Sequence, residues 1–275
     1  MDNADSKTIE GFGDEWSRFD QSGLTEDDHE EMFDSYFSIF PWDQLPENSV
    51  GLDMGCGSGR WAIKVAPRVK QLHCIDASKD ALEVTKKNLA GMNNCQFHLA
   101  SVVDIPLPDE SADFAYCLGV LHHIPDTADG IKACVGKLKK GGPCLLYLYY
   151  AFDNKPSWYR LIWKLSETGR FFVSVMPFPF RYISSQIIAL LVYWPIARLA
   201  RLLSNTGFNV DSFPLSYYKD RSFYVMRTDS LDRFGTRLEK RFTKKQIIKM
   251  MEGAGLENIL FSNTKPYWCA VGYKK

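Results

Sequence analysis

Apolar runs alternate with amphipathic segments from residue 49 to residue 151, and this alternation leaves few folds open to the chain. Short apolar runs, which predict strands, lie at 49–55, 71–78, 95–101, 112–120 and 143–151. Segments that predict helices lie between them at 59–69, 79–92 and 126–142. Strands separated by helices at this pitch predict a doubly wound α/β sheet whose strands are parallel.

The alternation stops after residue 151 and resumes near the C-terminus. Thr243 and Gln246 have capping-box spacing at the start of a predicted helix, 243–255. The two apolar runs that follow, joined by a short loop, predict an antiparallel hairpin. We therefore expect a mostly parallel, seven-stranded sheet closed by this hairpin, with a largely helical insertion after strand five. The expected parts are an N-terminal helical lid (1–48), a core (49–151 and 243–275) and an insertion that caps the substrate (152–242).

The composition is that of a globular protein: 45% of the 275 residues are hydrophobic and 24% are charged. The seven cysteines are scattered and lack metal-ligand spacing, so we expect reduced thiols, no metal site and a cytoplasmic location. The chain does not open with a basic and then apolar leader, which argues against a secretory signal.

The formal net charge is zero, but the charges are unevenly distributed. Residues 1–50 hold fourteen acids and two bases, whereas residues 155–204 hold seven bases and one acid. An acidic first segment and a basic later segment do not suit general nucleic-acid binding by the whole chain, so we expect no nucleic-acid partner. The charges leave the oligomeric state open.

Three glycines at alternate positions follow the first predicted strand, in the sequence GLDMGCGSGR (51–60). A glycine-rich turn between a strand and a helix can hold a nucleotide-like ligand at the helix N-terminus. The dinucleotide fingerprint needs a third glycine where this chain has Arg60, and the P-loop ending is missing. Asp53, just before the loop, suits a cation better than a phosphate. The ligand is therefore expected not to be a polyanion.

Three features occur in order along the chain: the spacing D-x-G-x-G-x-G, the acid Asp76 after the second strand, and the block LASVVDIPLPDESADFAYCLGVLHHIPD (99–126). Together they resemble class I S-adenosylmethionine-dependent methyltransferases. The block is similar to the branch that includes quinone and sterol methyltransferases. The resemblance covers about residues 50–150 and 243–274. It implies the Rossmann-like fold, methyl transfer as the activity and S-adenosyl-L-methionine as the cofactor.

The resemblance also implies a role for each matching residue. Gly55, Gly57 and Gly59, with Cys56 between them, would let the backbone pass close to the cofactor, and Asp53 would orient its ammonium group. Asp76, followed by Ala77, would accept both ribose hydroxyls. The other implied contacts are Ser101 and Val102 at the adenine and Leu118 along the methionine moiety. Many members of the family have an acid where this chain has Ser101.

Two neighbouring histidines, His122 and His123, follow the fourth strand at the edge where such sheets bind ligands. Either is a candidate general base for a protonated acceptor. His123 is the better candidate, because its place resembles that of a histidine that faces the acceptor in related enzymes. The alternative is that the pair only shapes the loop before Pro125.

An aromatic segment, GFGDEW (11–16), precedes the core. It resembles a lid that folds over the cofactor in related enzymes. Phe12 and Trp16 are expected either to stack on the adenine or to hold the N-terminal helix in place.

The insertion contains an apolar and basic stretch, residues 171–203. Its longest uninterrupted apolar run, 187–197, contains Pro195 and is far shorter than the ~20 residues that span a bilayer. The following turns carry Arg198 and Arg201 beside an apolar helical face. Such a helix either lies on a membrane surface, in a salt-dependent way, or covers the substrate cleft.

These features together predict a methyltransferase whose acceptor is a small molecule, a glycan or a lipid-linked molecule. A histidine base favours O- or N-methylation over C-methylation. Two alternatives stay open: a non-catalytic cofactor-binding module of the same fold, and a nicotinamide-dependent oxidoreductase, which Arg60 and Asp53 disfavour.

Overall fold

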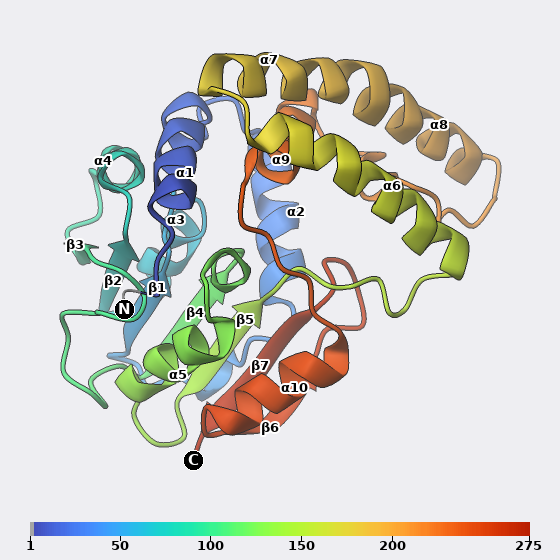
Figure 1. Ribbon diagram of the computed structural model, residues 1–275. Coiled ribbons are helices and arrows are strands. Elements are labelled where there is room, and N and C mark those ends of the chain that lie inside the picture. The colour runs from blue at the N-terminus through green and yellow to red at the C-terminus, as the bar shows by residue number, and fades with distance from the viewer. Residues whose placement is uncertain (1–2) are drawn as a thin grey trace. The chain divides into compact units, whose positions relative to one another are not determined.

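The computed structural model describes residues 3–275, and its chain forms two compact units. The core unit comprises residues 1–21, 30–151 and 238–275. The insertion unit comprises residues 22–29 and 152–237. The elements of both units are labelled in Figure 1.

The core unit is built on a single seven-stranded sheet with strand order β3-β2-β1-β4-β5-β7-β6. The first five strands pair in parallel, and β7 pairs antiparallel with β5 and β6. The prediction of a mostly parallel sheet closed by an antiparallel hairpin is therefore confirmed. The strands are β1 (Val50–Met54), β2 (Gln71–Asp76), β3 (Cys95–Leu99), β4 (Phe114–Leu118), β5 (Pro143–Tyr147), β6 (Leu256–Phe261) and β7 (Cys269–Lys274).

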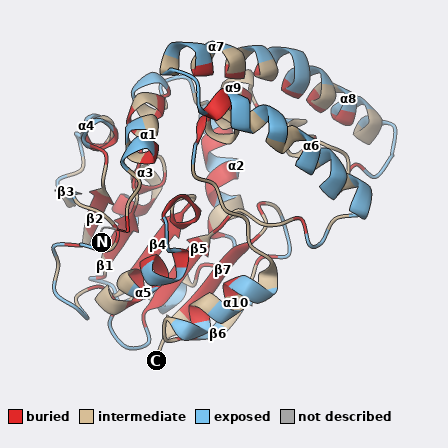
Figure 2. Cartoon of the chain, in the orientation of Figure 1, coloured by how far each residue is buried: buried red, intermediate tan, exposed pale blue. Residues whose placement is uncertain are grey.

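The central strands are almost entirely buried, and β4 is buried at every residue, because helices cover both faces of the sheet (Figure 2). On one face, α5 (Thr127–Lys137) and α10 (Lys244–Gly253) pack beside each other and bury Ile131 and Met251. On the other face, α2 (Glu26–Phe37) lays Phe37 edge-on against the ring of Tyr116, at 5.3 Å. This burial explains why the core strands lack polar alternation in the sequence.

The helix after β1 is shorter than the segment 59–69 suggested. It consists of α3 (Ala62–Val65) and a 3₁₀ turn, Ala66–Arg68. The left-handed backbone at Gly59 delays its start, and Pro67 cannot extend it as a regular helix. The next helix, α4 (Lys79–Asn88), starts as predicted, with Ser78 as its N-cap.

The insertion unit is helical, with α6 (Ser157–Ser174), α7 (Phe178–Ile188), α8 (Trp194–Asn205) and α9 (Phe223–Gly235). A π-helical turn, Ala189–Tyr193, joins α7 to α8, so one helix runs from residue 178 to residue 205. The apolar run 187–197, which contains Pro195, suggested a much shorter segment than this 28-residue helix. The proline lies in the first turn after the π-helical turn, where its missing N–H and its ring are tolerated.

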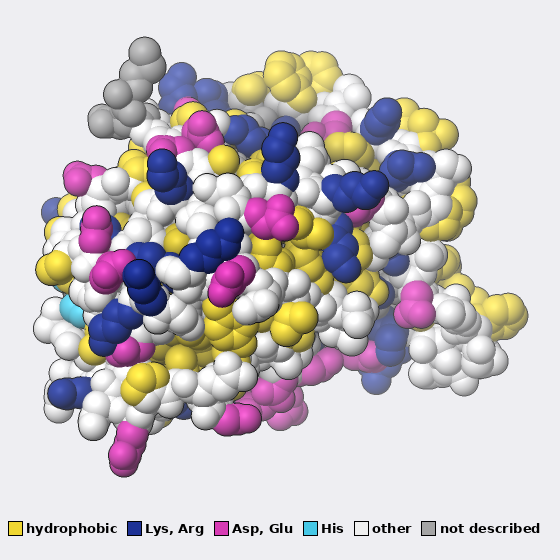
Figure 3. Space-filling view, turned by 90° about the horizontal axis from the view of Figure 1, so that it is seen from below, with side chains coloured by type: hydrophobic (Ala, Val, Ile, Leu, Met, Phe, Trp, Pro, Cys, Tyr) yellow, Lys and Arg dark blue, Asp and Glu magenta, His cyan; other side chains and the backbone are white. Residues whose placement is uncertain are grey.

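Acidic and basic side chains are interspersed on the face of the molecule drawn in Figure 3. Ion pairs in the core unit follow the same pattern, such as Lys137 with Asp109 at 2.8 Å and Lys139 with Asp113 at 2.7 Å. Neither sign of charge dominates this face.

Candidate active site

The glycine loop follows β1 at the carboxyl edge of the sheet and has a backbone that only glycine adopts easily. The φ angles of Gly55, Gly57 and Gly59 are +81°, +57° and +76°. Side chains would also collide here. A Cβ on Gly55 would lie 2.3 Å from Cγ2 of Val120, and a Cβ on Gly57 would lie 3.0 Å from the indole nitrogen of Trp16. The glycines are therefore required both by the backbone turn and by the close approach of the Val120 and Trp16 side chains.

Side chains of α4 hold the loop in this shape. The hydroxyl of Thr85 donates to the Gly57 carbonyl at 2.6 Å, and the amide of Asn88 donates to the Ser58 carbonyl at 2.9 Å. Gly59 packs against Thr85 and does not itself line the pocket described below. These contacts pre-organise the loop from beneath.

Asp76 ends β2 beside the loop, with both carboxylate oxygens directed at backbone N–H groups. Oδ2 accepts from the amide of Gly57 and Oδ1 from the amide of Ser78, each at 2.8 Å. Burial raises the pKa of Asp76, although these backbone donors act in the opposite direction. Each carboxylate oxygen has a second lone pair, so the group can still accept from ligand hydroxyls.

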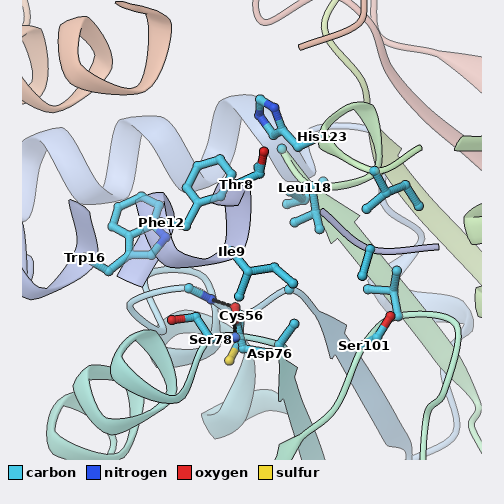
Figure 4. Close-up of a pocket in the computed structure, with 18 of the residues that line it drawn as sticks. Thr8, Ile9, Phe12, Trp16, Cys56, Asp76, Ser78, Ser101, Leu118 and His123 are labelled. Carbon is cyan, nitrogen blue, oxygen red and sulfur yellow. Dashed lines mark hydrogen bonds between the residues drawn. The ribbon is translucent and has the colours of Figure 1, made fainter. Parts of the chain in front are cut away.

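A pocket opens above the loop, within the core unit (Figure 4). It holds about 880 Å³ of space between atoms, part of it open to solvent. The predicted residues that line it are Phe12, Trp16, Gly55, Cys56, Gly57, Asp76, Ala77, Ser101, Val102, Leu118 and His123. The structure thus brings together residues from five separate segments of the chain.

The helix α1 (Ser6–Arg18) forms one wall of this pocket. Figure 4 shows Thr8, Phe12 and Trp16 along α1, on the side opposite Cys56 and Asp76. At its start, Asn3 donates to the Asp126 carbonyl at 2.7 Å and accepts from the Asp126 amide at 2.6 Å. The chain ahead of α1 is thereby fastened to the loop that carries the histidines.

Asn3, Thr8 and Arg60 are among the residues at this pocket that were not predicted as site residues from the sequence. The guanidinium of Arg60 lies 5.7 Å from the ring centre of Trp16 and 4.6 Å from that of Trp61. The Thr8 hydroxyl is buried at the pocket and has no hydrogen-bond partner among residues 3–275. Thr8, Phe12 and Trp16 are four residues apart, and this helical spacing was the signal that could have identified Thr8.

Asp53 lies beneath the loop, in the core of the sheet, and does not line the pocket. Burial raises its pKa to about 8, the Tyr116 hydroxyl acts against this, and the Asp76 carboxylate adds to it. At neutral pH the group is therefore mostly a neutral acid. Its predicted contact with the cofactor's ammonium stays a prediction, and a cation nearby would favour ionisation of this carboxyl.

This buried acid predicts a pH dependence of stability. The folded protein holds the Asp53 proton up to about pH 8, whereas an unfolded chain loses it near pH 4. The free energy of unfolding should therefore fall as the pH rises from 6.5 to 8, by up to about 1.4 kcal/mol per pH unit, and level off above that range. Urea titrations at several pH values measure this slope.

Asp53→Asn is the control, because it keeps the shape and removes the ionisation. Its slope between pH 6.5 and 8 should be clearly smaller, with any remainder due to groups such as Asp76. Equal slopes in the two proteins would contradict the assignment of a raised pKa to Asp53.

His123 lines the pocket from the short 3₁₀ helix Leu121–His123 after β4. Its Nδ1 lies 2.7 Å from the Leu238 carbonyl. Because a carbonyl only accepts, Nδ1 carries the hydrogen, and the neutral ring keeps its lone pair at Nε2. Phe12 packs edge-on against this ring at 4.9 Å. The geometry can thus supply a base at the pocket.

His122 is fully buried outside the pocket lining, with its ring stacked on Tyr149 at 3.8 Å. Burial first, then His123 and Arg241, hold its pKa well below the usual value. Neither ring nitrogen has a hydrogen-bond partner in the described part of the chain. His122 therefore stays neutral, and the structure brings only His123 to the pocket.

Within residues 3–275, no group of three or more His, Cys, Asp or Glu side chains could hold a metal ion. All seven cysteines are free thiols, and six of them are buried. Cys56, inside the loop, has its pKa raised by burial, so it is a poor nucleophile.

Residues 52–146 match a family model described as a methyltransferase domain. The match contains the glycine loop, Asp76 and both histidines. Together with the sheet order and the pocket, it shows that the chain contains a class I S-adenosyl-L-methionine-dependent methyltransferase domain.

Curated relatives match over the same part of the chain. The uncharacterized methyltransferase YcgJ of Bacillus subtilis is 31% identical over 105 residues, which are 38% of this chain and 42% of that protein. A ubiquinone biosynthesis O-methyltransferase of Alkalilimnicola ehrlichii is 36% identical over 93 residues, 33% and 38% of the two chains. A demethylmenaquinone methyltransferase of Staphylococcus epidermidis is 30% identical over 101 residues, 36% and 42%. The matched segments span less than half of each relative.

Solved structures share the fold over most of the chain. A SAM-dependent methyltransferase of Methanosarcina mazei superimposes with a TM-score of 0.52 at 16% identity, covering 86% of this chain and 98% of the other. One of Thermotoga maritima superimposes with a TM-score of 0.50 at 15% identity, covering 96% and 100%. At these identities the likeness supports the fold alone.

Proposed function

We propose that this protein is an enzyme that transfers a methyl group from S-adenosyl-L-methionine to a small-molecule, glycan or lipid-linked acceptor. The observation that carries the proposal is the pocket, in which a glycine cradle, the Asp76 carboxylate and His123 meet. Its residues fit the cofactor: side chains at Gly55 or Gly57 would fill the cradle, and Asp76 keeps acceptor capacity for two hydroxyls.

We assign the cofactor contacts as follows. Gly55, Cys56 and Gly57 hold the chain of the cofactor against the loop, and Asp76 with Ala77 holds its ribose. Ser101 and Val102 contact the adenine, and Leu118 lies along the methionine moiety. Phe12 and Trp16 cover the cofactor from α1, where Trp16 is already fixed between the loop and Arg60. When bound, the cofactor supplies an electrophilic methyl group on a sulfonium.

His123 is assigned as the base that takes a proton from the acceptor. Its Nε2 lone pair and its place at the pocket support this role. A base is needed for a hydroxyl or a protonated amine, so O- or N-methylation is favoured over C-methylation. His122, which is buried and neutral, is assigned to support the His123 ring. The centres of the two imidazole rings lie 4.0 Å apart.

The acceptor class is supported by two observations. Two of the relatives are named as a ubiquinone biosynthesis O-methyltransferase and a demethylmenaquinone methyltransferase. The wall of the pocket is mostly apolar and contains the buried Thr8 hydroxyl, which suits a largely apolar molecule with one polar group.

The free thiols support a cytoplasmic location.

The test is to incubate the protein with methyl-labelled cofactor and an extract of its source organism, and then to separate lipid-soluble from water-soluble products. Label should enter a small molecule or lipid, and much less label should enter with an Asp76→Ala variant at the same cofactor concentration. Binding of the cofactor without any transfer of label would instead support a non-catalytic module. Tight binding of NAD in place of S-adenosyl-L-methionine would support an oxidoreductase.

A further inference from the structure

The insertion unit carries its polar contacts inside and its large apolar side chains outside. Twenty large hydrophobic side chains are exposed in the described part of the chain, and eighteen of them lie between Trp158 and Phe208. Figure 2 shows the long exposed stretches on α6, α7 and α8. The surface of a water-soluble unit normally has the opposite polarity, so this surface needs a partner.

The long helix 178–205 has two different faces. The face that contacts α9 buries Arg181 and Ser185. Arg181 donates to the Gly235 carbonyl at 3.1 Å, and the backbone carbonyl of Ser185 accepts from the Ser230 hydroxyl at 2.9 Å. The outer face carries the exposed side chains Phe180, Ile183, Ile187, Leu190, Leu191, Trp194, Leu199 and Leu202. One face is thus fixed to the unit by polar bonds, while the other is apolar and open.

Helix α6 repeats this arrangement. On its inner side, Glu167 pairs with Arg233 of α9. Arg170 donates to the carbonyl of Thr236, the residue that follows α9, at 2.8 Å. Its outer side exposes Trp158, Leu161, Ile162 and Leu165. We call the exposed apolar side chains of α6 and of helix 178–205 the apolar face.

The exposed charges carried by these helices are basic, and one acid from outside them, Asp220, pairs with Arg201 at 3.6 Å. Arg160, Lys164 and Arg201 are exposed on these helices, and the single acid between residues 155 and 204, Glu167, is engaged in ion pairs. A two-fold dimer through this face would bring like charges together, because such an interface pairs a patch with itself. Anionic lipid headgroups, in contrast, complement exposed cations beside apolar side chains.

The long helix satisfies the length and hydropathy of a bilayer span, with a mean hydropathy of 1.6 over an 18-residue window. Its polar inner face, however, bonds to the rest of the unit, and Arg198 donates to the carbonyls of Lys219 and Arg221 at 2.8 and 3.2 Å. A spanning helix would have to give up these bonds. A helix lying in the plane of the interface keeps them and still buries its outer face.

We propose that the apolar face inserts into the interfacial layer of an anionic lipid bilayer and holds the protein on the membrane without spanning it. Insertion of apolar side chains, rather than the charges of Arg198 and Arg201, is the main attraction. This changes the expected salt dependence, because screening weakens the headgroup contacts and leaves the apolar insertion intact. The proposal does not depend on which acceptor is methylated.

The test is co-sedimentation of the full chain with vesicles of phosphatidylcholine and phosphatidylglycerol. The wild type should sediment with them and should still do so in part at 0.5 M salt, a concentration chosen so that the Debye length falls to about 4 Å. Ile187→Glu/Leu191→Glu should reduce the partition coefficient more than tenfold. The matched control is Leu99→Glu/Leu260→Glu, which changes two equally exposed side chains of the core unit and should bind like the wild type.

A second measurement avoids charged substitutions. Brominated lipids should quench the tryptophan fluorescence of the wild type, and the quenching should be smaller in Trp158→Phe/Trp194→Phe. A wild type that stays in the supernatant, or equal binding by both Glu variants, would overturn the proposal. So would a stable dimer in sedimentation velocity that the Ile187/Leu191 variant converts to a monomer, because a second copy would then cover the apolar face.

Discussion

Replacing Asp76 with alanine is expected to weaken binding of S-adenosyl-L-methionine by about 1.5–3 kcal/mol, or roughly 10- to 150-fold. The carboxylate lies at the pocket, at the end of β2, and can accept from both ribose hydroxyls of the cofactor. The substitution also removes the hydrogen bonds that Asp76 accepts from Gly57 and Ser78. Calorimetric titration of the cofactor and of S-adenosylhomocysteine measures the loss.

The direct contact can be separated from the effect on the loop with a 2′-deoxyribose analogue of S-adenosylhomocysteine. The analogue should bind the wild type more weakly than the parent compound does, and the two should bind Asp76→Ala almost equally. Asp76→Asn should lie between, since its amide keeps one acceptor oxygen. If Asp76→Ala bound the cofactor as tightly as the wild type, Asp76 would not contact the ribose. The same would follow if the analogue lost as much affinity relative to its parent in the variant as in the wild type.

The core of this fold could be predicted because its signals are local. Each strand from β1 to β5 is a short apolar run, and the loop at Gly55 needs backbone angles that glycine alone adopts easily. In a parallel sheet the carboxyl ends of strands meet at one edge. The approach of Asp76 and His123 to the glycine loop could therefore be expected from their places after the second and fourth strands, together with the family resemblance.

The wall formed by α1 could not be predicted in the same way. Asn3 contacts Asp126, which is 123 positions away, and no local pattern encodes such a contact. Thr8 is a common helix residue whose burial depends on what α1 packs against. The position of Asp53 shows the same limit: an acid in an apolar strand suggested a ligand contact, but whether it faces the pocket or the core depends on tertiary packing.

The length of helix 178–205 could not be predicted for a different reason. The apolar run 187–197 is short, and a proline inside such a run normally ends or kinks a helix, because it removes a hydrogen bond and crowds the preceding turn. Here a π-helical turn lies just before Pro195, and the helix continues to Asn205. Such turns have no sequence signal of their own, so the length of this helix became visible only in the structure, whereas an apolar face beside Arg198 and Arg201 was already expected from the sequence.

His123→Ala should lower turnover about 10²- to 10⁴-fold while cofactor affinity changes little, if His123 is the general base. Its ring lines the pocket and is held in a fixed position by the Leu238 carbonyl and by Phe12. The loss should appear in kcat under saturating cofactor. The fall of kcat on the acid side, which a base imposes, should disappear in the variant.

His122→Phe is the matched control, because it removes the neighbouring imidazole and keeps a flat ring against Tyr149. The ring nitrogens of His122 are buried and make no hydrogen bond among residues 3–275, so an apolar ring loses nothing there. This variant should keep turnover within a few-fold of the wild type. Full turnover in His123→Ala would show instead that the acceptor arrives already deprotonated or reacts through carbon, and the two histidines would then serve only to shape the loop between β4 and α5.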